Sequence, residues 1–141
     1  MKLLIINGPN LNLIGSREPE IYGTESPIKM IERFKTKYPN ITFEYYQSNL
    51  EGEIINALQE FADKTDGIIL NAGAYTHTSV AIADAVKSIK TPVVEVHMSN
   101  VMQRENFRHI SYISPSAAGV ISGFGSLSYE LAIHFYLLRN V

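Results

Sequence analysis

The chain has 141 residues, of which 45% are hydrophobic and 18% are charged, and its formal net charge is -2. This composition supplies a core for a single domain over residues 1–141, and it excludes a disordered chain and a general attraction to nucleic acid. The chain has no cysteine, which excludes disulfides and cysteine nucleophiles. The apolar run at 3–6 is too short for a signal peptide or a membrane span, so we expect a cytoplasmic protein without a membrane partner.

Short apolar runs alternate with amphipathic stretches along the chain. Strands are predicted at residues 3–6, 41–47, 67–72, 92–96 and 119–122. Helices are predicted from Ser26-Pro27 to before Pro39, at 53–64, from a cap at Thr76 or Thr78 to about 89, and at 127–138. This alternation predicts an α/β fold, a flavodoxin-like doubly wound sandwich with a five-stranded parallel sheet in the order 2-1-3-4-5.

Polar side chains gather after the predicted strands. Ligand sites in such sheets lie beyond the carboxyl ends of the strands, where segments distant in sequence meet. We therefore expect a site at this edge, formed by Asn7, Asn10 and Asn12 after the first strand, Asn71 and His77 after the third, and Glu95, His97, Ser99, Arg104 and Arg108 on and after the fourth.

Glu95 and His97 are two residues apart on a strand, so their side chains share one face. A carboxylate beside an imidazole fixes the tautomer of the ring and favours its charged form, which suits a general acid. An ordinary ion pair at a strand end is the alternative interpretation.

Arg17 and Tyr22 lie in a loop from residue 8 to about 24, a length typical of a lid. A tyrosine acts as a base near neutral pH only where positive charge in a dry site stabilises its phenolate. From the residues alone, a tyrosine that packs the loop against the body is the simpler interpretation.

Several other candidates have a structural alternative. Asn10, Asn12 and Asn71 could bind substrate oxygens or stabilise turns, and for Asn12 the turn role is favoured. His77 could donate to a substrate oxygen or assist a helix cap. The sequence around Gly123 and Gly125 favours a tight turn over an anion site, and His134, beside an apolar helical stripe, indicates packing or an interface.

Four blocks of the chain together resemble one enzyme family, the type II 3-dehydroquinate dehydratases. The resemblance covers residues 3 to about 137, and it departs from the family pattern at Ala83, where arginine is common, and at Ser128, where glycine is common. The blocks are Asn7–Leu13 with Gly15, Arg17–Pro19 and Tyr22-Gly23; Ser48–Gly52; Asn71–Ser79; and Glu95–Asn100 with Arg104 and Phe107–His109.

The resemblance implies a hydro-lyase of the shikimate pathway that needs no cofactor or metal and removes water from 3-dehydroquinate by anti elimination through an enolate. It also implies a homo-oligomer, a dodecamer built from trimers. For the reaction, the resemblance implies Tyr22 as base with Arg17 and Arg108 as its cationic neighbours, Asn10 as enolate stabiliser, and His97 with Glu95 as acid. For substrate binding, it implies that Asn71 and the backbone at Met98 and Ser99 bind the carboxylate and that His77 and Arg108 bind the ring hydroxyls. It also implies that Asp84 approaches the site of a neighbouring subunit.

Three other functions are weighed against this one. A Schiff-base route to the same product needs a lysine in the site, and every lysine falls on a predicted helix or before the first strand. A phospho-receiver needs an acidic cluster where Asn71 stands, and a flavin module needs a phosphate-binding first loop, from which Pro9 removes a donor. An inactive homologue is disfavoured by the complete set of acid, base and carboxylate-binding residues.

Overall fold

The structure, a computed structural model, describes residues 1–16 and 18–139. Five parallel strands form one sheet in the order β2-β1-β3-β4-β5, so the predicted fold class and strand order are confirmed. The strands are β1 (Lys2–Asn7), β2 (Thr42–Gln47), β3 (Gly67–Asn71), β4 (Val93–His97) and β5 (Gly119–Ser122).

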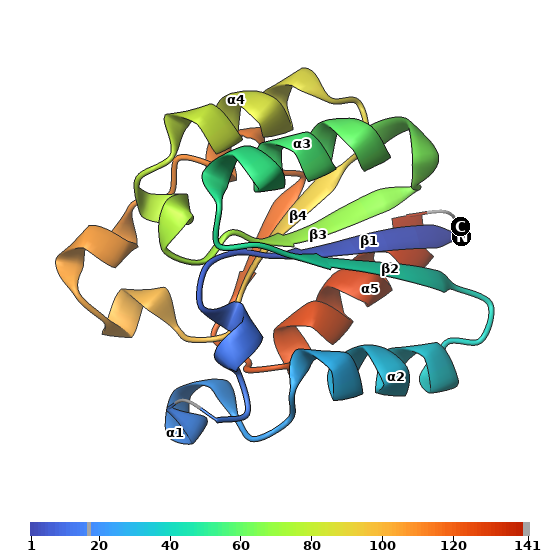
Figure 1. The fold of residues 1–141 in the computed structure, drawn as a ribbon, viewed down its shortest axis with the longest axis horizontal. Helices are drawn as coiled ribbons and strands as arrows, with labels where there is room; N and C mark the ends of the chain where they lie inside the picture. Colours follow the sequence, from blue (N-terminus) through green and yellow to red (C-terminus); the bar gives the residue numbers. More distant parts are fainter. Residues whose placement is uncertain (17, 140–141) are drawn as a thin grey trace.

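Helices cover both faces of the sheet (Figure 1). Helices α2 (Pro27–Lys37) and α5 (Leu127–Arg139) lie on one face, and α3 (Glu51–Phe61) and α4 (Val80–Ser88) lie on the other. Because successive strand residues point to opposite faces, the odd and even residues of β1 belong to two separate cores. Leu3 and Ile5 pack toward α2 and α5, and Leu4 and Ile6 pack toward α3 and α4.

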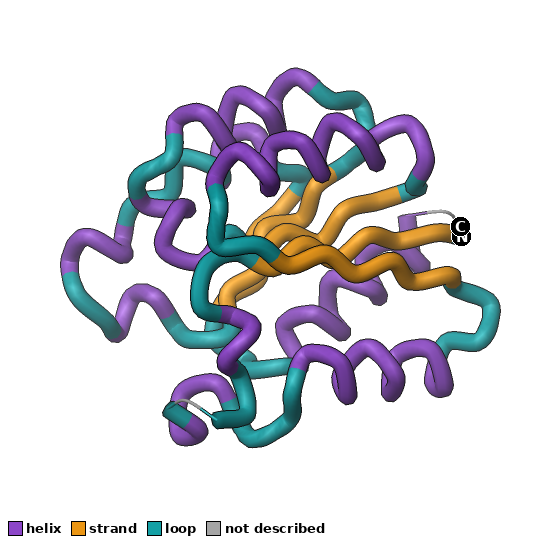
Figure 2. Tube along the Cα trace, viewed as in Figure 1, coloured by secondary structure: helices purple, strands orange, loops and turns teal. Residues whose placement is uncertain are grey.

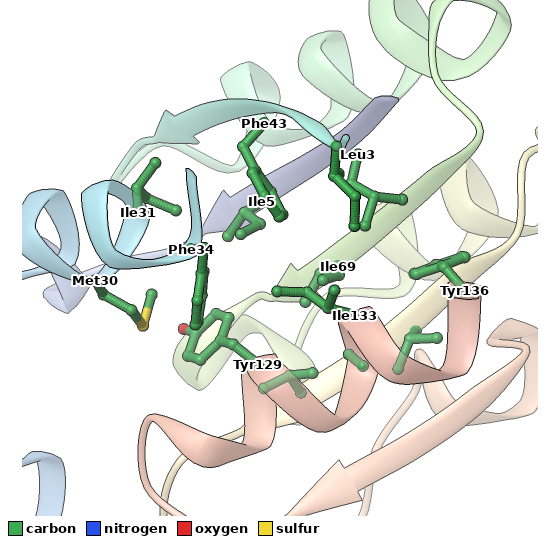
Figure 3. Packing of buried hydrophobic residues seen from close by; sticks show 14 of the residues in the cluster. Leu3, Ile5, Met30, Ile31, Phe34, Phe43, Ile69, Tyr129, Ile133 and Tyr136 are labelled. Carbon is green, nitrogen blue, oxygen red and sulfur yellow. The ribbon is translucent and has the colours of Figure 1, made fainter. Parts of the chain in front are cut away.

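The core between the sheet, α2 and α5 contains two large buried side chains from α5, Tyr129 and Tyr136. They lie among Phe34 of α2 and the branched residues of the strands (Figure 3). A buried tyrosine needs a partner for its hydroxyl group, and both tyrosines have one. Helix α5 is therefore attached to the sheet by hydrogen bonds as well as by apolar packing.

Helix starts follow the sequence in one case and depart from it in another. Ser26 caps α2 as predicted, since its side chain accepts a hydrogen bond from the backbone N–H of Lys29, and Pro27 is the first helical residue. The prediction that Thr76 or Thr78 caps the next helix is wrong. Residues 73–77 form a 3₁₀ helix, and Ser79 caps α4 by accepting from the N–H of Ile82.

Long connections gather at the carboxyl edge of the sheet. The expected loop over residues 8–24 contains two short helices in its described residues, a 3₁₀ helix at Leu11–Leu13 and α1 at Pro19–Tyr22. The segment between β4 and β5 also lies at this edge as a chain of short helical turns (Figures 1 and 2). Among the described residues, no helix is both long enough and apolar enough to span a bilayer.

Candidate active site

A cavity of about 290 Å³ lies at the carboxyl edge of the sheet. Its walls come from the segment after β1, from α1, from the end of β3, and from β4 with the turns that follow it. The predicted residues that line it are Asn10, Tyr22, Asn71, His77, His97, Met98, Ser99, Arg104 and Arg108, and Glu105 joins them.

Tyr22 ends α1 and presents its phenol to a guanidinium group. Arg104 Nη1 donates to the Tyr22 hydroxyl oxygen at 3.2 Å and lies 3.3 Å from Ser99 Oγ. A cation in contact with a phenol oxygen stabilises the phenolate. The sequence had indicated Arg17 and Arg108 for this task. Arg17 lies outside the described residues, so Arg104 is the contact that the structure provides.

Glu95 and His97 form a buried pair on β4. The Nε2 atom of His97 lies 2.7 Å from Glu95 Oε1, and Glu95 is completely buried. Burial raises the pKa of Glu95, but hydrogen bonds from His97, Ser114 and Ser111 outweigh burial and hold that pKa below its ordinary value. Glu95 is therefore ionised at neutral pH, and because it occupies Nε2, the ring nitrogen that can serve a ligand is Nδ1.

His77 stacks beside His97, with ring centroids 6.2 Å apart. Its Nδ1 lies 2.7 Å from the carbonyl oxygen of Ile110. Burial lowers the pKa of His77, and the neighbouring His97 and Arg108 lower it further against the effects of that carbonyl and of Glu95, so the neutral ring predominates at pH 7. Because a carbonyl only accepts, Nδ1 carries the proton and Nε2 is an acceptor. His77 can thus accept from a ligand hydroxyl, whereas the sequence had suggested a donor.

Asn71 ends β3 and is almost completely buried. Its Oδ1 accepts from the N–H of Gly73 at 3.2 Å, and its Nδ2 donates to the Tyr129 hydroxyl at 2.8 Å. The chain after β1 comes close to this point, since a Cβ on Gly8 would lie 2.4 Å from the carbonyl oxygen of Ala72. A residue with a side chain would separate the two segments, and glycine at position 8 keeps them together at the cavity.

Two residues on the cavity wall have left-handed backbone conformations. Asn10 has φ of 67° and Glu18 has φ of 43°, and among the described residues they are the non-glycine residues with positive φ. Asn10 is held there by Asn49, whose Oδ1 accepts the Asn10 N–H at 3.0 Å. Such conformations are costly and concentrate at functional sites.

Arg108 reaches the cavity with its charge partly compensated. Its Nε donates to Glu105 Oε2 at 2.8 Å, and Glu105 also lines the cavity. Arg108 is therefore placed to contact ligand oxygens, while Arg104 supplies the positive charge at Tyr22.

Three other predictions concern the backbone at Met98 and Ser99, the side chain of Asn12 and the side chain of Asp84. The backbone after β4 is held by the turn before α5, since the N–H groups of Gly123 and Gly125 donate to the carbonyl oxygens of His97 and Met98. Asn12 lies in the 3₁₀ helix and does not line the cavity, in keeping with the favoured turn role. Asp84 is exposed on α4 and outside the cavity lining.

Comparison with known proteins gives a consistent assignment. The sequence model of the family described as Dehydroquinase class II matches residues 1–137. The chain belongs to the class II dehydroquinase family. A 3-dehydroquinate dehydratase of Fusobacterium nucleatum is 53% identical, with 97% of each chain covered. A type II dehydroquinase structure from Butyrivibrio crossotus superposes with a TM-score of 0.91 at 48% identity, covering 96% of this chain and 97% of that one. A type II dehydroquinase structure from Propionibacterium acnes superposes with a TM-score of 0.90 at 36% identity, covering 95% of this chain and 94% of that one.

Two features of the structure were not assigned from the sequence. Arg104 appeared in the motif that carries the resemblance, but it received no role, because sequence spacing does not show which guanidinium meets Tyr22. Ser128, a departure from the family pattern, accepts the N–H of Phe124 at 3.1 Å and so closes the turn before α5. Ala83, the other departure, lies on α4 away from the cavity, and nothing in the structure explains it.

Proposed function

We propose that this protein removes water from 3-dehydroquinate to give 3-dehydroshikimate, a step of the shikimate pathway, with Tyr22 as base and His97 as acid. The observation that carries this assignment is one cavity with a phenol held by Arg104 and an imidazole held by ionised Glu95. Acid and base must hold opposite protonation states at one pH, and partners of opposite charge make this possible. The family and the curated relatives act on the same substrate.

In the first step the Tyr22 phenolate takes a proton from the carbon next to the ketone. The electron pair of that C–H bond moves into the ring, and the ketone oxygen becomes an enolate oxygen. Asn10, on the cavity wall with its backbone fixed by Asn49, is placed to stabilise this charge together with water. Arg104 stabilises the phenolate before the transfer.

In the second step the enolate collapses and the carbon–oxygen bond to the β-hydroxyl breaks. A carbon–carbon double bond forms, and the leaving oxygen takes a proton from Nδ1 of His97, so water departs. The proton leaves from one face of the ring and the hydroxyl from the other, which is an anti elimination. Glu95 holds Nε2 throughout and compensates the imidazolium charge.

The other lining residues hold the substrate. The carboxylate is assigned to Asn71 and to the backbone at Met98 and Ser99, and the ring hydroxyls to His77 and Arg108. His77 accepts through Nε2, as its hydrogen bond to Ile110 requires. Arg17, which lies outside the described residues, is assigned as a further cationic neighbour of Tyr22.

We propose that the protein assembles into a dodecamer built from trimers, in which Asp84 completes the site of a neighbouring subunit. Asp84 is exposed and lies outside the cavity of its own chain, so it can approach a substrate only in another subunit. Large apolar side chains at Met102, Phe107 and Ile110 are also more than half exposed beside the site, which suits a buried subunit contact.

The test is the ultraviolet absorbance of the conjugated product after addition of 3-dehydroquinate. Tyr22→Phe is expected to lower kcat by about a thousandfold or more while the far-ultraviolet circular dichroism is unchanged. Tyr46→Phe, on β2 and outside the cavity lining, serves as the matched control and should retain activity. An inactive but folded wild-type protein would refute the function, and an active Tyr22→Phe variant would refute the role of the base.

A second arm separates this route from Schiff-base chemistry. None of the residues that line the cavity in the described part of the chain is a lysine. Borohydride added during turnover should therefore leave the mass of the protein unchanged. A stable mass increase on a lysine would overturn the proposed mechanism.

A further inference from the structure

A tyrosine behind the cavity connects two asparagines on neighbouring strands. Asn7 and Asn71 are register partners at the carboxyl ends of β1 and β3. The Tyr129 hydroxyl, completely buried on α5, donates to Asn7 Oδ1 at 2.7 Å and accepts from Asn71 Nδ2 at 2.8 Å. Tyr129 does not line the cavity, but Asn71 does.

The direction of every bond in this network follows from one backbone donor. The N–H of Gly73 can only donate, so the Asn71 atom that it meets is Oδ1 and the amide nitrogen faces Tyr129. The Tyr129 oxygen then accepts from Asn71 and gives its single proton to Asn7. One N–H of the Asn71 side-chain amide donates to the Tyr129 hydroxyl, and this bond fixes the direction of the second N–H.

We infer that Tyr129 is a positioning residue, which holds the Asn71 amide so that its second N–H can bind the substrate carboxylate. This inference rests on the proposed function, in which Asn71 binds that carboxylate. Without the tyrosine hydroxyl, the amide nitrogen loses its partner on α5, and the orientation of the group is set by Gly73 alone. Carboxylate binding would then have to order the amide, and this entropic cost would weaken the affinity for the substrate.

Helix α5 provides a matched control for this inference. Tyr136 is buried to the same degree, with 1% exposure, and its single hydroxyl proton is shared between the carbonyl oxygens of Ile68 and Pro92, which lie 2.7 and 2.9 Å from the hydroxyl oxygen. These carbonyls lie at the amino ends of β3 and β4, away from the cavity. Both tyrosines project from α5 toward the strands (Figure 3). A change to phenylalanine removes one buried hydroxyl at either position, but only the change at Tyr129 removes a partner of Asn71.

The experiment compares Tyr129→Phe with Tyr136→Phe in the assembled enzyme. Both variants should lose stability to urea, because each leaves buried polar groups without a partner. Tyr129→Phe alone should raise KM about tenfold with a smaller change in kcat. Its pH–rate profile should match wild type, because the Tyr22–Arg104 and His97–Glu95 contacts are untouched. Equal KM values in the two variants would overturn the inference.

A double-mutant cycle with Asn71→Ala separates positioning from a general loss of packing. If Tyr129 acts through Asn71, then Tyr129→Phe should raise KM no further in the Asn71→Ala background. Independent, additive effects would overturn the inference. Should Tyr129→Phe fail to fold, Asn7→Leu gives the same readout, because it removes the acceptor of the Tyr129 proton, lets that hydroxyl reorient and so weakens its hold on the Asn71 amide.

The wild-type assay distinguishes the possible failures. Wild type that does not dehydrate 3-dehydroquinate overturns the proposed function and this inference together. Active wild type with an unchanged KM in Asn71→Ala removes the carboxylate role of Asn71 and with it the inference, while the proposed reaction stands.

Discussion

Tyr22 and His97 reach one cavity from segments that are far apart in the sequence. Each has a charged neighbour that suits its task, a guanidinium beside the phenol and a carboxylate beside the imidazole. The two neighbours differ in setting, since Glu95 is completely buried while Arg104 is half-buried. Under the proposed roles of base and acid, removal of the guanidinium beside Tyr22 should therefore slow the reaction.

Arg104→Gln tests the guanidinium at the base. In the proposed mechanism, loss of the positive charge removes the cation that contacts the phenolate, so kcat at pH 7, measured by the product absorbance, should fall about a hundredfold. Arg104→Lys should retain part of the activity, because lysine keeps the positive charge but cannot reproduce the guanidinium contacts with Tyr22 and Ser99. Arg139→Gln, at the end of α5, is the control. An Arg104→Gln variant with the kcat of wild type would show that another cation serves Tyr22.

At the scale of elements, a cluster of charged groups joins α2 to α5. Glu130 of α5 is almost completely buried and receives hydrogen bonds from Arg33, Lys37 and Tyr38. Arg33 also holds Glu25, in the segment between α1 and α2, through two nitrogen–oxygen contacts of 3.0 and 2.9 Å. This cluster ties the end of the active-site loop to the helix that carries Tyr129.

The cluster should make stability depend on pH in acid. Burial raises the pKa of Glu130, but its bonds to Lys37 and Tyr38 outweigh burial and lower that pKa below its ordinary value of 4.5. The stabilisation is therefore present above pH 4.5 and is lost as pH falls through the lower folded-state pKa.

Glu130→Gln should reduce the free energy of unfolding at pH 7 on the order of 1 kcal/mol, since two partners reach solvent. It should also lose less stability than wild type between pH 5 and 3, because the group that titrates is gone. Urea unfolding over this range measures both effects, with exposed Glu60→Gln as control. A variant with the acid response of wild type would assign that response to other carboxylates, such as Glu95.

At the scale of the whole molecule, the cavity is formed along one edge of the sheet and opens toward solvent. Asp84 lies on the outer surface of α4, and apolar side chains are exposed on the segment after β4. Both features are explained if other subunits cover this side of the chain.

Light scattering after size exclusion should give a mass twelve times that of the chain, with trimers as the first product of mild dissociation. Asp84→Ala should assemble normally and raise KM severalfold, because a contact to the substrate from the neighbouring subunit is lost. Exposed Asp63→Ala is the control. A fully active monomer, or an unchanged KM in Asp84→Ala, would contradict a site shared between subunits.

Sequence pattern predicted the architecture well and the details of the loops poorly. Continuous apolar runs at β1, β3 and β4 are typical of buried parallel strands, and their alternation with amphipathic stretches leaves few topologies. Around Thr76 the same reasoning failed, because several hydroxyl residues could cap α4 and the choice of Ser79 depends on the preceding 3₁₀ helix. The helical turn of α1 was also missed, since four residues show no periodicity.

The pair Glu95 and His97 was available from the chain alone, because residues two apart on a strand share a face. The same local rule cannot match Tyr22 with Arg104, or Tyr129 with Asn7 and Asn71, since 82, 122 and 58 residues separate these partners. Local spacing encodes period and burial, and these select the sheet and the edge where the site lies. Contacts between distant side chains depend on how the loops and α5 pack against that edge, and packing is a property of the folded chain.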